Sequence, residues 1–500
     1  MKEKLAAFKV EMGEIWDLNM AGSVLGWDQQ TNMPPNGAEE RSEQLATISK
    51  IAHIKATSTE LGKTLDELLE YAKTLDPDSD DARLIRRSKI DFDKMTRVPS
   101  NKVAEYARVT TIGQEKWVQA RAKSDFSIFR PHLERIVDLR REYADYFKPY
   151  DHVYDPLLDD FEPGLKTADV KDIFNRLRPQ QVELIRAIAA RPQIEDDFLH
   201  LNYDDKRQLD FGVDVITRFG YDWTAGRQDR SAHPFTTSFG IGDVRITTRI
   251  LENLLSSGLF STMHEAGHGM YQQGLAANLS RTILANGASM AVHESQSRMW
   301  ENLVGRSRAF WRFFYPKLQA VFPTQLGNVS MEKFYKAINK VEPSYIRTES
   351  DEATYNLHVM LRLELEIALM EGTLKVADLP EAWNTRMKEY LGITPRNDSE
   401  GVLQDVHWSG GMIGYFPTYA LGNLVSVQLW EVINQDIPDL ESQIEQGEFG
   451  TLLGWLREKV HRHGSKFDPQ ELVQKVTGSK IDPQPYVGYL RKKYSDIYGL

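Results

Sequence analysis

Two histidines and a glutamate in residues 261–273 have the types and the spacing of a metal-binding site. His264, Glu265 and His268 form the pattern H-E-x-x-H, and the whole chain of 500 residues contains only 12 histidines. On a helix, positions i and i+4 lie on one face, so both imidazoles can bind one ion while Glu265 stands beside it. The surrounding residues are mostly apolar, which favours burial of these polar groups around an ion. The pattern predicts a zinc hydrolase.

A catalytic zinc site needs a third protein ligand that leaves one position open for water. Glu294, in the helical-looking segment 288–305, is the predicted ligand. Thermolysin-like enzymes also take this ligand from a glutamate on a later helix, but an aspartate follows theirs four residues on. Arg298 occupies that place here, so a different group must orient the histidines. The chain has no cysteine, so histidine and carboxylate must hold the ion, with Zn²⁺ expected and Co²⁺ or Mn²⁺ as possible substitutes.

The predicted chemistry is hydrolysis of a peptide bond by metal-activated water. Zinc lowers the pKa of a bound water to about 7, and Glu265 can accept its proton as general base and pass it to the leaving amine. The oxyanion of the tetrahedral intermediate needs a further hydrogen-bond donor. His407 and Tyr415, on either side of a glycine-rich turn, are the candidates, and Tyr419 is the substitute for Tyr415.

Most of the elements that must position these residues are predicted to be helices. Apolar residues recur every three or four positions in residues 1–75, with a break at 32–37, and again in residues 82–147. Similar spacing predicts helices that begin near Thr167, after Ser350, and at residues 423–433 and 485–497. We therefore expect a mainly α fold with a small β-sheet beside the H-E-x-x-H helix.

The apolar period changes to two between residues 231 and 250, just before the metal-binding segment. Phe235, Thr237 and Phe239 alternate with their neighbours, and the alternation resumes at Val244 and Ile246. This pattern predicts a β-hairpin that turns at residues 240–243, with an edge that could pair with an extended peptide. It could equally be a small structural hairpin.

Two glycines, Gly267 and Gly269, lie inside the predicted metal-binding helix, where glycine is unfavourable. They allow close approach of either a substrate or another helix. The residues alone do not choose between these two explanations.

The chain is predicted to form a single domain, residues 1–500. A loop rich in Asp, Pro and Tyr at residues 148–164 marks a soft subdomain boundary. It separates an N-terminal helical cover, residues 1–147, from a zinc-site and groove region, residues 165–500.

Composition excludes several classes of protein. The net charge of -11 and the pI near 5.7 argue against a nucleic-acid partner, because phosphate binding needs a basic surface. No run of about 18 apolar residues is present, so no membrane span is expected, and the N-terminus lacks the apolar core of a signal peptide. The absence of cysteine fits a reducing compartment. We expect a cytoplasmic protein.

Six separated motifs together resemble one family, the thermostable carboxypeptidase Taq (M32) metallocarboxypeptidases, and most closely its bacillus-type members. In chain order they are HPF from His233, DVRIT from Asp243, HEAGH from His264, HESQ from His293, IRTESD from Ile346 and GVLQDVHW from Gly401. The resemblance covers essentially the whole chain.

The resemblance implies a large helical metallopeptidase fold with a deep substrate groove and one divalent ion per chain. It implies release of single amino acids from peptide C-termini, with broad specificity and poor cleavage next to proline. It also implies a homodimer. His233, in the first motif, is a candidate for substrate binding, as is Tyr419.

A carboxypeptidase must also bind the α-carboxylate of its substrate. Arginine suits this role because it forms bidentate, charge-assisted hydrogen bonds. Arg347 is the first candidate and Arg245 the second. Two other functions stay open: a dipeptidyl carboxypeptidase or oligopeptidase with the same zinc site, and a non-catalytic peptide-binding scaffold.

Overall fold

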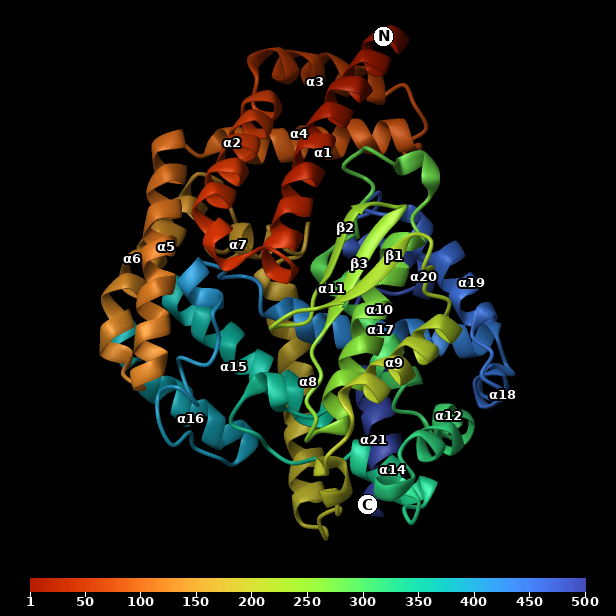
Figure 1. Cartoon of the computed structure of the whole chain (residues 1–500). Helices are drawn as coiled ribbons and strands as arrows, with labels where there is room; N and C mark the ends of the chain where they lie inside the picture. Colours follow the sequence, from red (N-terminus) through yellow and green to blue (C-terminus); the bar gives the residue numbers. More distant parts are fainter.

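The structure is a computed structural model that describes residues 1–500, and it is mainly helical with one small sheet, as predicted. The two termini lie at opposite ends of the molecule (Figure 1). No helix combines the length and the apolar content needed to cross a membrane.

The first part of the chain forms long helices, with the predicted break between the first two at a short 3₁₀ turn, Pro35–Gly37. In the last of them three residues of the apolar pattern, Leu133, Ile136 and Val137, are at most 2% exposed. These helices are α1 (Lys2–Thr31), α2 (Ala38–Ala56), α3 (Thr59–Ala72), α4 (Asp80–Arg97), α5 (Ser100–Lys123) and α6 (Phe126–Asp145).

Residues 148–164, where we predict a soft boundary, pack into the protein. They contain a short helix, α7 (Asp155–Asp159), and Tyr154 and Glu162 on either side of it are 0% exposed. Glu162 Oε1 accepts a hydrogen bond from Ala291 N–H, so this segment holds the start of a helix far along the chain. Two more helices follow, α8 (Thr167–Ala189) and α9 (Asp205–Phe219).

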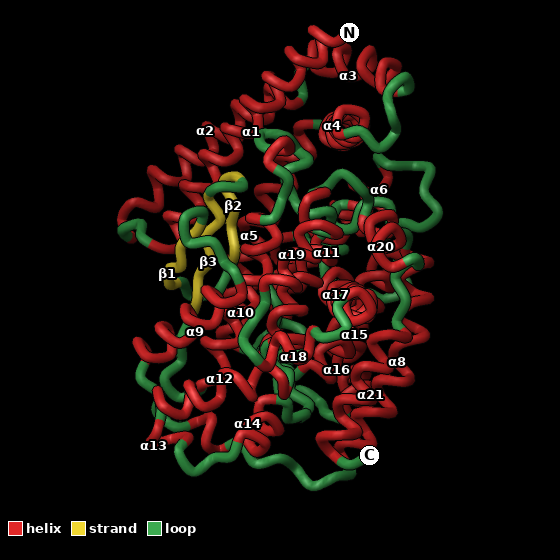
Figure 2. Tube along the Cα trace, turned by 90° about the vertical axis from the view of Figure 1, so that its right-hand side faces the viewer, coloured by secondary structure: helices red, strands yellow, loops and turns green.

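The sheet has three strands in the order β1-β3-β2 and lies on one side of the helical body (Figure 2). The predicted hairpin is present: β2 (Thr236–Gly240) pairs antiparallel with β3 (Asp243–Thr248). Strand β1 (Gly226–Arg230), which pairs parallel with β3, was not predicted. Its sequence, GRQDR, has no apolar residue and therefore no alternation to reveal a strand.

Helices make up the remainder of the chain. The helix predicted at residues 423–433 begins earlier, at Pro417, because proline at the first helical position has no N–H to satisfy. The remaining helices are α10 (Leu255–Gln273), α11 (Met290–Arg298), α12 (Arg308–Val321), α13 (Pro323–Leu326), α14 (Met331–Ile338), α15 (Glu352–Glu371), α16 (Leu379–Leu391), α17 (Pro417–Asp436), α18 (Leu440–Glu445), α19 (Gly450–Lys459), α20 (Pro469–Thr477) and α21 (Gln484–Tyr498).

The two glycines of α10 are explained by close packing on opposite sides of the helix. A Cβ atom on Gly267 would lie 2.6 Å from the Cα of Ser297, so α10 and α11 approach each other at backbone distance. A Cβ atom on Gly269 would lie 2.8 Å from the Tyr221 ring and 3.3 Å from Ile246 of β3. The two glycines thus allow α11 on one side and Tyr221 and β3 on the other to pack directly against the H-E-x-x-H helix.

Candidate active site

The structure brings the three predicted metal ligands together. The ligand atoms of His264, His268 and Glu294 all lie within 4.8 Å of one another. The Nε2 atoms of His264 and His268 are 3.5 and 3.4 Å from Glu294 Oε2. We call these three residues the metal cluster.

Helix packing places Glu294 opposite the two histidines. Gly267 lets α11 approach α10, and on the other side of α11 a Cβ atom on Gly422 of α17 would lie 2.6 Å from the Cβ of Glu294. With glycines on both neighbouring helices, Glu294 has little freedom to move away from the cluster.

The other ring nitrogen of each histidine is engaged elsewhere. His264 Nδ1 is 2.9 Å from Glu301 Oε2, and His268 Nδ1 is 2.6 Å from His293 Nδ1. Each Nε2 is therefore left to face Glu294, and two imidazole nitrogens with one carboxylate are a donor set that suits Zn²⁺. These residues fit a divalent ion.

Glu301 is the orienting group that the sequence required but did not identify. It lies two helical turns after Glu294, where α11 widens into a π turn, Met299–Val304, of a kind frequent at functional sites. The signal available was a second carboxylate seven residues after the predicted ligand. Its weight was low because glutamates at that spacing are common on solvated helix faces.

Arg298 holds both carboxylates in place. Its Nε donates to Glu294 Oε1 at 2.7 Å and one terminal nitrogen donates to Glu301 Oε2 at 3.3 Å. Burial alone would raise the pKa of Glu294, but Arg298, His264 and His268 hold it well below its usual range. Burial likewise opposes ionisation of Glu301, yet Arg298 and His264 lower its pKa to about 2. Both groups are therefore carboxylates at neutral pH.

Glu265 is fixed by strand β2. The hydroxyl of Thr236 donates to Glu265 Oε2 at 2.6 Å, and it also lies 3.0 Å from the Glu265 backbone oxygen. The other carboxylate oxygen, Oε1, has no hydrogen-bond partner in the protein. Thr236 was not predicted as a site residue, because its contact with Glu265 joins a strand to a helix.

Arg347 lies in a second buried group, which we call the arginine cluster and define as Arg347, Arg362 and Asp405. Asp405 Oδ1 accepts from Arg347 Nε at 3.0 Å and from a terminal nitrogen at 2.8 Å. Asp405 Oδ2 accepts from Arg362 Nε at 2.7 Å. Arg362 lies on α15 and was not predicted.

Tyr355 of α15 connects the two clusters. Its hydroxyl accepts a hydrogen bond from Arg347 at 2.8 Å, and the Arg298 guanidinium lies 4.6 Å from the centre of its ring. Arg298 in turn binds Glu294, so the metal cluster and the arginine cluster are neighbours.

His407, Tyr415 and Tyr419 lie together beside the arginine cluster. His407 Nε2 is 3.2 Å from the Tyr419 hydroxyl, and the Tyr415 ring centre is 5.4 Å from His407. The Arg347 guanidinium lies 4.7 Å from the centre of the Tyr419 ring. Burial lowers the pKa of His407 to about 4 and raises that of Tyr415 to about 12. Both side chains are therefore neutral at neutral pH.

Two predicted residues are not brought to these clusters. Arg245 Nε donates to Asp243 Oδ1 at 2.8 Å, and its guanidinium lies 4.4 Å from the centre of the Trp27 ring of α1. His233 is exposed, and its backbone oxygen accepts from the Ser231 hydroxyl. A role for either in binding substrate stays a prediction.

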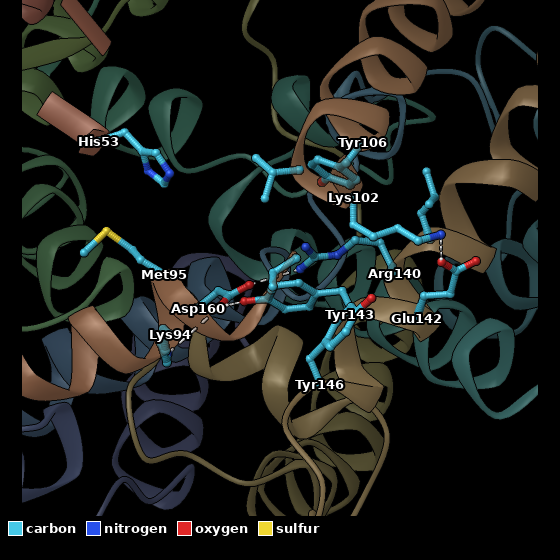
Figure 3. Close-up of a pocket in the computed structure, with 13 residues that line it drawn as sticks. His53, Lys94, Met95, Lys102, Tyr106, Arg140, Glu142, Tyr143, Tyr146 and Asp160 are labelled. Carbon is cyan, nitrogen blue, oxygen red and sulfur yellow. Dashed lines mark hydrogen bonds and ion pairs between the residues drawn. The ribbon is translucent and has the colours of Figure 1, made fainter. Parts of the chain in front are cut away.

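A cavity of about 370 Å³ lies among the N-terminal helices, away from the metal cluster, and Figure 3 shows its lining. The charged side chains around it are paired with one another: Arg140 with Asp160 at 3.1 Å, and Lys102 with Glu142 at 2.5 Å. None of the predicted site residues lines it. The substrate groove implied by the resemblance stays a prediction.

A helical fold in which an H-E-x-x-H helix and a following helix bring two histidines and a glutamate together defines a metallopeptidase of the helical class. The model of one such family, carboxypeptidase Taq (M32) metallopeptidase, matches residues 7–494. The chain belongs to this family and is a metallocarboxypeptidase, as the six motifs predict.

Known relatives span nearly the full length of the chain. Thermostable carboxypeptidase 1 of Thermus thermophilus is 40% identical over 488 residues, 96% of each chain. Carboxypeptidase 1 of Bacillus subtilis is 37% identical over 479 residues, 96% of this chain and 95% of the relative. The crystal structure of an M32 carboxypeptidase from Deinococcus radiodurans superposes with a TM-score of 0.97 at 40% identity and covers 100% of both chains.

Proposed function

We propose that this protein removes single amino acids from the free C-termini of peptides, with broad side-chain specificity and poor cleavage next to proline. The observation that carries the proposal is the convergence of His264, His268 and Glu294 beside Glu265. We propose Zn²⁺ as the ion, one per chain. Lewis acidity toward the peptide carbonyl and toward water is what a divalent ion supplies when bound there.

Glu265 is the proposed general base. Thr236 holds its Oε2, and Oε1, free of protein partners, accepts a proton from the attacking water and then delivers it to the leaving amine. Because the Thr236 hydrogen bond fixes the carboxylate, Oε1 can keep one direction during both transfers.

Tyr415 and His407 are the proposed donors to the oxyanion of the tetrahedral intermediate. With a pKa raised to about 12 by burial, the Tyr415 hydroxyl keeps its proton at neutral pH and can donate it in a hydrogen bond. His407 is neutral and can donate from one ring nitrogen.

Arg347 is the proposed anchor for the substrate carboxylate. Three of its N–H groups are engaged, two by Asp405 and one by Tyr355. A guanidinium has five N–H groups, so two remain for a substrate. Its packing against Tyr419 places it next to the proposed oxyanion donors.

The products of an N-blocked pentapeptide, followed by mass spectrometry, test the proposal. We expect stepwise loss of single residues, and far slower loss from the same peptide with a C-terminal amide. Loss of two residues at a time would instead indicate a dipeptidyl carboxypeptidase.

Glu265→Gln tests the base and excludes a mere binding scaffold. We expect the variant to retain its bound zinc, measured by elemental analysis, while kcat falls by about 10²–10⁴-fold or more. Retained turnover would disprove the assignment of Glu265.

We also propose that the protein is a homodimer, as the family resemblance implies, and that it works in the cytoplasm, which the absence of cysteine fits. Light scattering on the purified protein should then give twice the chain mass of 57.3 kDa.

A further inference from the structure

The arginine cluster contains two cations and a single anion. The carboxylate of Asp405 is shared, with Oδ1 on Arg347 and Oδ2 on Arg362. The three side chains are 6%, 0% and 9% exposed for Arg347, Arg362 and Asp405. Water therefore screens the excess charge only weakly.

No neighbouring group supplies the missing negative charge. Arg362 also donates to the backbone oxygen of His358 and to the side-chain oxygen of Gln404, and its guanidinium lies over Trp383, all of them uncharged. Tyr355, which accepts a hydrogen bond from Arg347, offers a hydroxyl and not a carboxylate. The cluster thus carries a net charge of one positive unit.

The titratable groups next to the cluster do not alter this charge at neutral pH. Burial lowers the pKa of Arg362 to about 10, with Asp405 opposing the shift and Arg347 adding to it, so the guanidinium stays protonated. His407, whose pKa burial lowers to about 4, stays neutral.

We propose that Arg362 determines the selectivity for a free C-terminal carboxylate, by neutralising Asp405 so that the charge of Arg347 is left for the substrate. Without Arg362, Asp405 would cancel the charge of Arg347, and the site would favour an anionic chain end far less. The inference rests on the proposed function and deepens it. Arg362 is wholly buried and acts through Asp405, so it is a specificity-determining residue rather than a catalytic one.

A purely structural role for Arg362 makes a different prediction. Arg362 holds Gln404 and the His358 carbonyl, so its loss could lower stability and the fraction of active enzyme. That loss would scale the rates on all substrates equally. The ratio of rates on two substrates that differ only in charge would not change.

The test is the ratio of kcat/KM for an N-blocked peptide acid to that for the matching C-terminal amide. The zinc-loaded full-length enzyme is compared with Arg362→Met and Arg362→Lys, and with Arg386→Met as control. Arg386 lies on α16, is bound to Glu364, and matches the change in net charge outside the arginine cluster.

We expect Arg362→Met to lower the acid-to-amide ratio about tenfold or more, as for loss of a charge-assisted interaction. Arg362→Lys keeps the charge and should keep most of the ratio, and Arg386→Met should keep all of it. An unchanged ratio in Arg362→Met would overturn the inference. If Arg362→Met does not fold, an acid-to-amide ratio that falls about tenfold or more in folded Arg362→Lys would also overturn the inference.

Failure of the proposed function would look different. A wild-type enzyme that cleaves acid and amide equally would overturn both the proposed function and the inference. A wild-type enzyme that prefers the acid, with Arg362→Met equally selective, would overturn the inference alone.

Discussion

His264 and His268 can each bind an ion only through the nitrogen that their surroundings leave free. For His264 that choice is made by Glu301, which takes Nδ1, and for His268 by His293. Arg298 stands where thermolysin-like enzymes have an aspartate. It is bound to Glu294 and Glu301 and so keeps one ligand and one orienting group at a fixed distance from each other. The ligand pattern of thermolysin-like enzymes is thus met here with a different set of supporting residues.

For single residues of the site, we predict that Glu301→Gln weakens zinc binding. The amide still accepts a hydrogen bond from His264, but it carries no charge to raise the basicity of the ring, and Arg298 and Arg306 each lose an anionic partner. Loss of such an orienting partner typically costs about 10–100-fold in metal affinity. Competition with a chromophoric chelator measures the dissociation constant.

Glu332→Gln is the matched control, because Glu332 is bound by Arg308 away from the metal cluster. It should leave zinc affinity unchanged. Equal dissociation constants for both variants and the wild type would show that Glu301 does not tune His264.

At the scale of elements, the site depends on how closely α10, α11 and α17 approach one another. Gly267 and Gly422 are the positions where a side chain would collide with a neighbouring helix. Helix α15 adds a second support, since Tyr355, Arg362 and Glu366 all bind segments that carry site residues. Glu366 accepts hydrogen bonds from Trp408 Nε1 at 2.8 Å and from Gly414 N–H at 3.1 Å.

Gly267→Ala should destabilise the protein and weaken zinc binding together. The new methyl group would meet backbone atoms, Ser297 Cα at 2.6 Å and the Gln296 oxygen at 2.7 Å, which cannot rotate away. We expect a loss of about 1–3 kcal/mol or more in the free energy of unfolding. Urea denaturation and the chelator competition measure the two effects.

Gly454→Ala on α19 is the control, because nothing lies within 4 Å of the added Cβ. It should be neutral or stabilise by up to about 1 kcal/mol, as alanine does in a helix. If Gly267→Ala behaves like Gly454→Ala, α10 and α11 have more freedom than their packing indicates.

At the scale of the whole molecule, the N-terminal helices are bound to the segment that carries His407. The Tyr106 hydroxyl of α5 donates to the Gly411 oxygen at 3.0 Å, and Trp117 Nε1 donates to the Leu403 oxygen at 3.0 Å. Figure 1 shows α5 and α6 beside the later part of the chain. The first helices therefore support the site, while their role as a cover over it stays a prediction.

The double variant Tyr106→Phe/Trp117→Phe should loosen this segment. Each hydrogen bond contributes about 1 kcal/mol, so we expect faster amide hydrogen exchange in residues 403–411 and a higher KM, with zinc content unchanged. Tyr150→Phe/Trp223→Phe removes hydrogen bonds from the same residue types at the surface and should change neither. Equal rates of amide hydrogen exchange in residues 403–411 of both double variants would contradict the support of this segment by α5.

The sequence was most informative where neighbours in the chain are also neighbours in space. One helical face determines that His264 and His268 lie together, and apolar alternation revealed β2 and β3. Strand β1 was missed because it lacks that alternation and depends on the edge of β3.

The helical fold, the H-E-x-x-H helix, the third ligand Glu294 and the family could be predicted from the sequence, because helix geometry and motif spacing are local properties. Three contacts could be found only in the folded protein: Thr236 holds Glu265, Glu301 orients His264, and Arg362 shares Asp405 with Arg347. Arg362 and Asp405 are 43 residues apart. Contacts of this kind arise from the packing of whole helices and loops, which no short stretch of sequence specifies.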